Sequence, residues 1–427
     1  MIPKTPGGPW AMLAIAVFLA ALVAALWSGR IPLSSDLPRP ESSGPVHGKS
    51  RFREMASDTH AARKRAADPK FVQQWLDELL ERHPEAEPGK RDVPDHENGH
   101  LAWVEFSEET MEEIELPECV SHYVTDPTLE NRKCAEEWLD HHKHIRDALV
   151  AIGAIRQQAM GDHRFDMTST PGVNNISNAF YMLLASGLIA AEDGNEPLAR
   201  STFASAMGLV RHMEGIEASS LIARVIATGS RTVIYQKFLD RIYPMIANDA
   251  DRLAVWRDTL SPGDTRDGMA RALIGDNLRI AKLFISSAYS GEFDSLIEIN
   301  ANDAETQLLI NAQFEVNARA IAAMKSGSAL DSIPSIYAQP VETRGMSGES
   351  RNFFIEQMES SQSAMTAILK KETHLMMYDA ALAAALGVAI PYDPVSGKPF
   401  LWDKSTKTLS APEGTTPQKP LSLPIKN

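Results

Sequence analysis

Apolar residues recur at helical spacing along most of the chain after residue 67. Asp68-Pro69 is typical of a helix start, because an Asp side chain accepts hydrogen bonds from free backbone N–H groups and Pro fits the first helical turn. The apolar positions that follow predict a helix that ends before Pro84. Further segments of helical length and composition are 175–192, 196–213, 217–242, 245–260, 266–288, 302–325 and 349–386.

The stretch after Pro84 is acidic and rich in turn residues, and Asp126-Pro127 then begins another predicted helix. The apolar face of that helix runs from Cys134 to Ile152. No run of alternating apolar and polar residues, the signature of a half-buried strand, lies between the predicted helices. We therefore expect an all-α body over residues 68–390, built as an irregular helical bundle or solenoid.

One pair of predicted helices shows a packing pattern of small and aromatic residues. Close antiparallel helices need small side chains where they cross, and tetratricopeptide repeats (TPR) place such residues at fixed positions. The residues that fall at those positions are Gly187, Gly194, Ala199, Phe203 and Ala206. A shift by the repeat length of about 34 residues does not reproduce the pattern. The pair is interpreted as a single TPR-like hairpin, with an ordinary αα-hairpin as the alternative.

The N-terminal segment has the clearest apolar run. Ala11 to Leu26 carries no charged side chain, and Trp10 and Trp27 bracket it, as at the two interfaces of a bilayer. It predicts a transmembrane anchor over residues 1–30, so that a single-pass protein in the bacterial inner membrane would hold its body in the periplasm. A cleaved signal peptide is the alternative, because Val23-Ala24-Ala25 offers small residues at a cleavage site. On either interpretation the body is exported.

A linker and a strongly acidic stretch follow the anchor. Residues 31–67 are rich in Pro, Ser, Gly and Arg without apolar periodicity, which is typical of a flexible linker. The formal net charge of −14 is concentrated in residues 71–150, which hold 21 Asp or Glu against 7 Lys or Arg. Nucleic-acid binding needs clustered basic side chains that displace phosphate counterions. The acidic body therefore argues against a nucleic-acid partner.

The chain has two cysteines, Cys119 and Cys134. Thiols oxidise outside the cytosol, so in an exported protein this pair predicts a disulfide, and closing a loop of this size contributes roughly 3 kcal/mol in the chain-entropy model. Two unpaired thiols are the alternative in a reducing compartment. The cysteines with His122 and His141 are also compatible with a zinc site, although the spacing of the second pair is not that of a standard zinc finger.

The sequence H-E-N-G-H at residues 96–100 matches H-E-x-x-H, in which two His one helical turn apart bind zinc and the Glu acts as general base. That geometry needs a helix, whereas Pro-Asp precedes the motif and Asn98-Gly99 is a strong turn dipeptide. We therefore expect a turn here, with no catalytic residue and no cofactor. The alternative is a zinc site formed by His96 and His100, with Glu97 as its base.

Two elements of the chain resemble those of a known family. Residues 93–103, V-P-D-H-E-N-G-H-L-A-W, resemble the V-P-D-x-E-N-G element near the start of uncharacterised proteobacterial proteins that carry an N-terminal membrane anchor. Residues 390–403, I-P-Y-D-P-V-S-G-K-P-F-L-W-D, resemble their closing P-x-D-P-x-S-G-x-P-F-x-W-D element. The rest of the chain resembles this family loosely. The resemblance implies an anchored envelope protein without a known activity, and in the family the position of His96 is not fixed as histidine.

The C-terminal segment, residues 391–427, begins with residues that restrict the backbone. Its first three prolines each fix a φ angle, Gly397 permits a positive one, and Asp393 can accept hydrogen bonds from the turn. We expect a compact clasp whose aromatic residues fold onto the preceding helix. These aromatic residues are Tyr392, Phe400 and Trp402. The polar, Pro-rich tail beyond Ser410 is predicted to be disordered.

Two classes of function remain after these observations. The sequence contains no phosphate-binding loop, no dinucleotide fingerprint and no recognisable catalytic triad. The favoured hypothesis is a non-catalytic envelope protein that acts through protein–protein interaction. The alternative is a zinc-dependent hydrolase that uses the H-E-N-G-H motif. Helical structure over residues 93–104 would favour the enzyme, whereas a turn there would remove that hypothesis.

Overall fold

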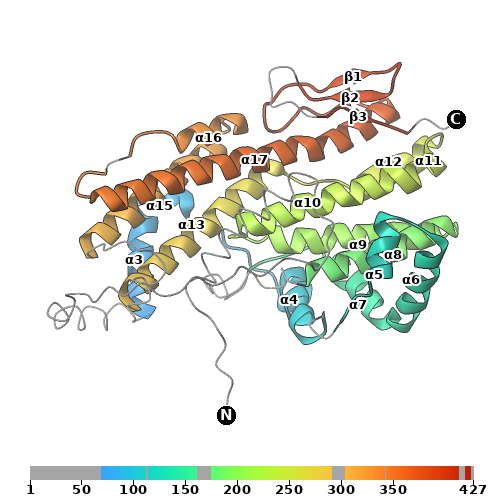
Figure 1. Cartoon of the computed structure of the whole chain (residues 1–427), viewed down its shortest axis with the longest axis horizontal. Coiled ribbons are helices and arrows are strands. Elements are labelled where there is room, and N and C mark those ends of the chain that lie inside the picture. Colours follow the sequence, from blue (N-terminus) through green and yellow to red (C-terminus); the bar gives the residue numbers. More distant parts are fainter. Residues whose placement is uncertain are drawn as a thin grey trace, which may run out of the picture. The chain divides into compact units, whose positions relative to one another are not determined.

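The computed structural model describes residues 69–111, 114–160, 175–290, 303–341, 343–412 and 419–424 (Figure 1). The predicted anchor, Ala11 to Leu26, and the predicted linker over residues 31–67 lie outside these ranges. None of the helices that the structure describes is long and apolar enough to cross a membrane.

The described residues are predominantly helical, as the sequence pattern predicts. The α-helices are α3 (Pro69–Arg82), α4 (Gly99–Glu109), α5 (Glu118–Thr125), α6 (Leu129–His141), α7 (Lys143–Ala154), α8 (Ile176–Glu192), α9 (Glu196–Glu214), α10 (Leu221–Lys237), α11 (Tyr243–Ile246), α12 (Ala250–Thr259), α13 (Thr265–Ser290), α15 (Asp303–Lys325), α16 (Ile333–Ile336) and α17 (Gly348–Leu386). The shorter turns are η1 (Pro84–Ala86), η2 (Asp95–Glu97), η6 (Leu330–Ser332) and the π-helical turn η5 (Phe238–Ile242).

Local signals set several helix boundaries. α3 begins at Pro69 and ends at Arg82, close to the boundary predicted from Pro84. α9 follows Asn195, whose side chain accepts a hydrogen bond from Leu198 N at 3.3 Å. This bond satisfies one of the backbone N–H groups that the first turn of a helix leaves free.

The long helix predicted from Asp126-Pro127 onward is in fact two helices. α6 ends at His141 and α7 begins at Lys143, since His142 leaves the helical conformation (φ −101°, ψ 26°). The His142 ring stacks on Trp138 with 4.1 Å between ring centroids, and its Nδ1 lies 2.9 Å from Trp138 O. The break lets α7 contact both α8 and α9. The sequence pattern also does not predict α4 and α5, which lie in the acidic stretch.

α8 and α9 form an αα-hairpin to which α4, α7, α10 and α12 add further contacts with α9 (Figure 1). A Cβ atom on Gly187 of α8 would lie 2.5 Å from Thr202 Oγ1 and 2.7 Å from the Phe203 ring, so only glycine permits this close approach. Gly194, in the turn between the helices, has a φ of +77°. Ala199 is fully buried on the facing side of α9. The predicted hairpin is therefore present, and its likeness to a tetratricopeptide repeat stays a prediction.

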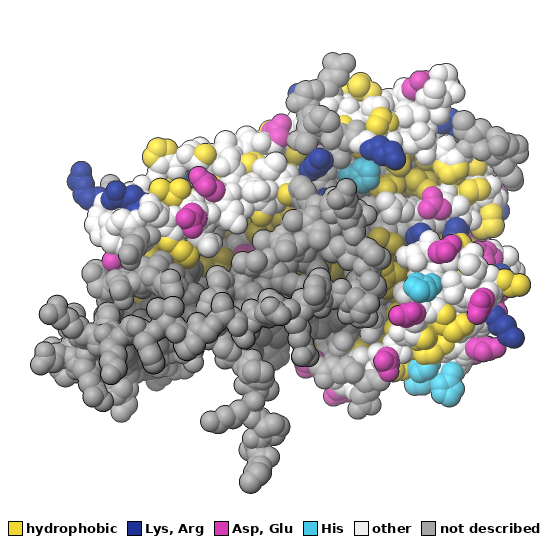
Figure 2. All heavy atoms as spheres, in the orientation of Figure 1, with side chains coloured by type: hydrophobic (Ala, Val, Ile, Leu, Met, Phe, Trp, Pro, Cys, Tyr) yellow, Lys and Arg dark blue, Asp and Glu magenta, His cyan; other side chains and the backbone are white. Residues whose placement is uncertain are grey.

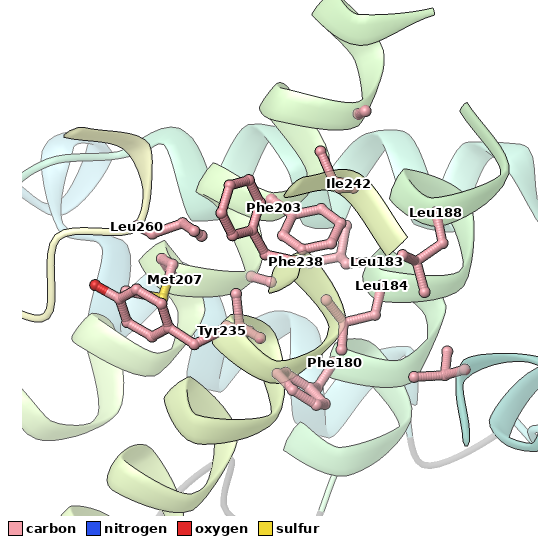
Figure 3. Packing of buried hydrophobic residues seen from close by; sticks show 14 of the residues in the cluster. Phe180, Leu183, Leu184, Leu188, Phe203, Met207, Tyr235, Phe238, Ile242 and Leu260 are labelled. Atoms are coloured by element: carbon pink, nitrogen blue, oxygen red, sulfur yellow. The ribbon is translucent and has the colours of Figure 1, made fainter. Parts of the chain in front are cut away.

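The main hydrophobic core lies around α8, α9 and α10 (Figure 3). Phe203 of α9 contacts Trp256 of α12 edge to face, with 5.5 Å between ring centroids. Trp256 is fully buried, and its Nε1 donates to Glu196 Oε1 at 3.0 Å, so its one polar atom is satisfied. α17 joins the same core through Tyr378, which stacks on Tyr235 at 5.5 Å.

Gly275 of α13 lies against the segment between α9 and α10, where a Cβ atom would come within 1.6 Å of Ser219 O. Gly275→Ala is therefore expected to lower the free energy of unfolding by about 1–3 kcal/mol, because one of the two backbones must move. Gly229 of α10 has no neighbouring atom within 4 Å of its Cβ position. Gly229→Ala should raise stability by roughly 0.5–1 kcal/mol, since alanine favours a helix. Urea unfolding of the full-length protein in detergent measures the free energy of unfolding of both variants. A Gly275→Ala protein as stable as wild type would contradict the close contact between Gly275 and Ser219.

The C-terminal segment contains a small sheet that the sequence pattern does not predict. Its strands are β1 (Leu401–Asp403), β2 (Thr408–Ser410) and β3 (Leu421–Ser422), paired antiparallel in this order. Leu409 lies opposite Trp402 on one side and Leu421 on the other. Leu409 and Leu423 are both buried in the hydrophobic core. The prediction that the tail beyond Ser410 is disordered is therefore wrong for β3, because apolar residues of the tail complete the sheet and the core.

The chain divides into two compact units. The first comprises Met1–Glu78, Ala281–Ile310 and Thr343–Asn352, and the second comprises Leu79–Ile280, Asn311–Glu342 and Phe353–Asn427. In the first unit, the buried Glu305 accepts a hydrogen bond from Ser347 N. The candidate site residues identified from the sequence all lie in the second unit.

Candidate functional site

The H-E-N-G-H motif does not lie on one helix. Asp95–Glu97 forms the turn η2, Asn98 caps α4 with an extended backbone (φ −94°, ψ 98°), and α4 begins at Gly99. His96 therefore precedes the helix that contains His100. The His96 side chain is 81% exposed, whereas His100 is buried. The two imidazoles do not share a helical face, which is the arrangement that H-E-x-x-H zinc sites use.

The Glu-Asn-Gly part of the motif fastens the start of α4 to the segment after α7. The buried Asn98 side chain accepts a hydrogen bond from Ala159 N at 3.1 Å and donates one to Ala159 O at 2.9 Å. Gly99 N donates to Gln157 O at 2.9 Å, and Gln157 Nε2 donates to Glu97 Oε2 at 2.8 Å. Glu97, the candidate general base, is therefore hydrogen-bonded within the fold.

His100 contacts His212 of α9, a residue that the sequence motif does not include. His100 Nδ1 lies 3.0 Å from His212 O, and His212 Nε2 lies 2.9 Å from Ile152 O. A Cβ atom on Gly99 would lie 2.1 Å from the His212 ring, so glycine is required where α4 meets α9. The two histidines therefore connect α4, α7 and α9 through backbone carbonyl groups.

His212 gives the fold an acid-sensitive point. Its burial lowers its pKa to about 4, and the hydrogen bond to Ile152 O offsets part of this effect. In the unfolded chain a histidine has a pKa of about 6.5. Between about pH 6.5 and pH 4 the unfolded state therefore binds a proton that the folded state does not, so stability should fall as the pH falls through this window.

The variant His212→Gln should lose less stability than the wild type between pH 7 and pH 5, because its side chain does not titrate there. Thermal unfolding of the full-length protein at a series of pH values measures the difference. Equal pH dependence of the two proteins would show that another group causes the acid sensitivity.

Asp393 organises the C-terminal clasp. It is fully buried, and its Oδ2 accepts hydrogen bonds from Ser396 N at 3.0 Å and Ser396 Oγ at 2.6 Å. Its Oδ1 accepts one from Thr373 Oγ1 of α17 at 3.1 Å. These bonds attach the turn to the helix before it, so the predicted capping role of Asp393 is confirmed.

The aromatic residues of the clasp divide into two groups. Phe400 is buried in the core, and Trp402 is partly buried against it. Tyr392 is 65% exposed, so the prediction that it folds onto the helix is wrong. Successive side chains of an extended backbone point in opposite directions, and burial of Asp393 therefore turns Tyr392 outward.

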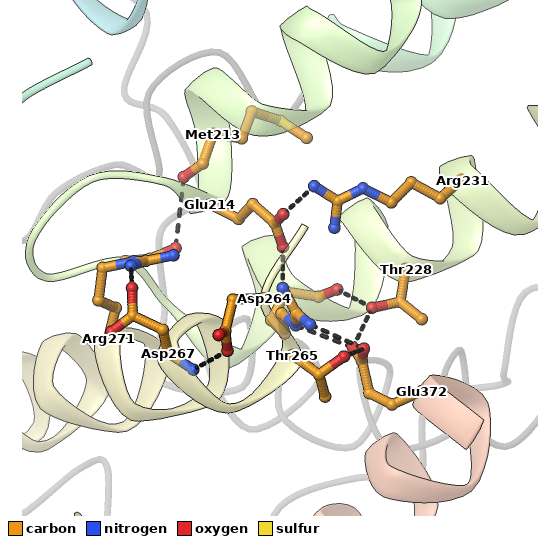
Figure 4. Close-up of polar contacts among 11 residues, drawn as sticks. Met213, Glu214, Thr228, Arg231, Asp264, Thr265, Asp267, Arg271 and Glu372 are labelled. Carbon is orange, nitrogen blue, oxygen red and sulfur yellow. Dashed lines mark hydrogen bonds and ion pairs between the residues drawn. The ribbon is translucent and has the colours of Figure 1, made fainter. Parts of the chain in front are cut away.

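A buried network of charged side chains joins α9, α10 and α17 (Figure 4). Arg224 Nε and Nη2 donate to the two carboxylate oxygens of Glu372 at 2.8 and 2.7 Å. Arg224 Nη1 also donates to Glu214 Oε2 at 2.5 Å, and Arg231 pairs with the other oxygen of Glu214. Thr228 Oγ1 donates to Glu372 Oε1 at 2.6 Å. Two positive and two negative charges balance inside the protein.

Solvent does not reach this network, since Glu372 has no exposed surface. Burial alone would raise the pKa of Glu214, but Arg224 and Arg231 outweigh it and lower that pKa, so the carboxylate stays charged. The network connects three helices and is closed to solvent. One feature of the sequence indicates this network. Arg224, Thr228 and Arg231 are spaced at i, i+4 and i+7, so they share a face of α10.

A surface pocket of about 310 Å³ lies between α6, α7, α8 and the start of α9. Its lining residues are Glu136, Leu139, Asp140, Arg146, Ser186, Ile189, Ala190, Asp193, Asn195 and Leu198. Arg132 pairs with Glu136 at 2.6 Å and with Asp193. The exposed Asp140 has no partner among the described side chains. Ser186 is 95% buried, and its hydroxyl likewise has no hydrogen-bond partner in the described part of the chain.

Cys119 and Cys134 form the predicted disulfide, which joins α5 to α6. Because each sulfur is bonded to the other, neither is a thiolate, and the alternative zinc site with His122 and His141 has no sulfur ligand. No group of three or more His, Cys, Asp or Glu among the described residues is placed to hold a metal ion.

The chemistry-bearing residues therefore fall into three sets. The H-E-N-G-H motif and the Asp393 turn hold parts of the fold together. The Arg–Glu network is closed to solvent, and the pocket beside α6 is open. Comparisons of the chain with protein-family models, with curated proteins and with solved structures find no match.

Proposed function

We propose that the protein is a non-catalytic, membrane-anchored envelope protein whose helical body docks a protein partner. The proposal rests mainly on the positions of the His and Glu side chains that could take part in catalysis. The buried His100 lies within hydrogen-bonding distance of the backbone of α9, and buried arginines neutralise Glu214 and Glu372. Glu97 is half-exposed, but its carboxylate accepts a hydrogen bond from Gln157 and so has a structural partner. The second unit also has an accessible pocket lined by acidic and apolar side chains, which suits the binding of a partner.

The proposed location rests on two features. The apolar segment from Ala11 to Leu26 has the composition of a single transmembrane helix. The disulfide between Cys119 and Cys134 supports an oxidising compartment, such as the periplasm, because such bonds are rare in the cytosol. Both features support a body held at the outer face of the inner membrane.

The proposal can be tested with photo-crosslinking in the membrane. A benzophenone amino acid is placed at one of three exposed apolar positions, Leu129, Val255 or Ile355, in the full-length protein. After irradiation of intact cells, adducts are purified and identified by mass spectrometry, and the metal content of the protein is measured in the same eluate.

A single protein captured in stoichiometric amount from at least one position, with no metal in the eluate, would support the docking function. The absence of adducts from all three positions, together with one zinc ion per chain that is lost on changing His96 and His100 to Ala, would overturn it in favour of a zinc hydrolase.

A further inference from the structure

We infer that the pocket beside α6 receives a Lys or Arg side chain of the docked protein. This inference rests on the proposed function and assigns the surface and the chemistry of contact. Figure 2 shows Asp and Glu side chains over the region of α5 to α7, at the right of the view. The pocket lies within that acidic region, between α6, α7 and the hairpin of α8 and α9.

The charges that line the pocket favour a cation. Glu136, Asp140 and Asp193 contribute three carboxylates, and Arg146 is the one cationic side chain in the lining. Arg146 already pairs with Asp147 at 2.8 Å. Arg132 already pairs with Glu136 and Asp193. The carboxylate left for an incoming group is that of Asp140, which has no partner among the described side chains and attracts a cation.

The other residues that line the pocket fit the apolar methylene groups and the charged head group of a basic side chain. Leu139, Ile189 and Leu198 supply apolar surface for its methylene groups. Ser186 supplies a hydroxyl oxygen without a partner among the described residues, and the head groups of Lys and Arg are donors only. Ser186 is 95% buried as a residue and lines the pocket, so its hydroxyl oxygen is an acceptor that a donor in the pocket can reach. The volume, about 310 Å³, lies at the lower end of the range for ligand pockets.

The surface next to the pocket indicates a protein rather than a free amine. Leu129, the first residue of α6, is 83% exposed. Glu136 and Asp140 follow it by seven and eleven residues, so all three lie on one stripe of α6. A rise of about 1.5 Å per residue places Leu129 roughly 10 to 16 Å from the two carboxylates. A partner segment with an apolar and a basic side chain at that separation covers both, which a small cation does not.

The test uses the benzophenone adduct formed at Leu129 of the full-length protein in cells. Asp140→Lys should lower its yield at least about tenfold, because it places a positive charge opposite the partner's positive charge. Glu359→Lys on α17 is the matched control, since it makes the same change of charge at an exposed position outside the pocket. It should leave the yield unchanged. Mass spectrometry of the adduct identifies the Lys or Arg of the partner that lies nearest to the crosslink.

Charge reversal of that partner residue to Glu should restore the adduct with Asp140→Lys. An adduct at Leu129 that survives Asp140→Lys would overturn the pocket assignment while leaving the docking function in place. Adducts at Val255 or Ile355 without one at Leu129 would also overturn the pocket assignment and leave the docking function in place. Saturable binding of arginine methyl ester that Asp140→Lys abolishes, with no adduct at Leu129, would show that the pocket takes a free cation and would overturn the protein contact. The absence of adducts at all three positions would count against the proposed function itself.

Discussion

Replacing Glu372 with Ala is expected to lower the free energy of unfolding of the full-length protein by about 3–5 kcal/mol. Glu372 is fully buried and accepts hydrogen bonds from Arg224, Thr228 and Thr265. Its removal leaves the Arg224 guanidinium in the interior with one carboxylate, Glu214, instead of two. The remaining charge is then poorly compensated where water cannot reach it. Urea unfolding followed by far-UV circular dichroism measures the loss.

Glu359→Ala is the matched control on the same helix, because Glu359 is exposed and its removal should change stability by less than about 0.5 kcal/mol. The double variant Arg224→Met with Glu372→Leu should lose less stability than Glu372→Ala, since it removes both charges and leaves Glu214 paired with Arg231. Equal losses for Glu372→Ala and Glu359→Ala would mean that the network does not exist in solution.

The helices with strong local signals could be predicted well. α8 and α9 match their expected ranges within one residue, because long apolar runs and the Asn195 cap mark them. α4 and α5 are short and lie in an acidic stretch, so their helical form depends on contacts made elsewhere in the fold. The break at His142 depends on packing against Trp138, and apolar periodicity continues across it. The C-terminal strands are two or three residues long, which is too short to show alternation.

The roles of the candidate site residues could not be predicted from the sequence alone. A sequence motif gives the residue types, whereas the role of each residue depends on which other residues it contacts in the fold. The sequence predicts a turn at Asn98, and the turn is present. The sequence does not show the hydrogen-bond partner of Asn98, Ala159, because it lies 61 residues away. Arg224 and Glu372 are 148 residues apart, so no local pattern pairs them. The disulfide could be predicted because oxidation leaves two cysteines only one intramolecular pairing.

The double variant Cys119→Ser, Cys134→Ser is expected to lower the free energy of unfolding by roughly 3 kcal/mol. The two cysteines lie 15 residues apart, and the bond between them restricts the unfolded chain more than the folded one. It also attaches α5 to α6, which carries Glu136 and Asp140 of the pocket. Urea unfolding of the full-length protein in detergent measures the loss, with dithiothreitol as the control.

Dithiothreitol should lower the unfolding midpoint of the wild type to that of the double serine variant and should leave the variant unchanged. This pattern would attribute the effect to the disulfide rather than to the serine side chains. If the reductant has no effect on protein purified from the cell envelope, the cysteines are reduced in the native protein. The disulfide would then no longer support an oxidising compartment, and the proposed periplasmic location would rest on the apolar N-terminal segment alone.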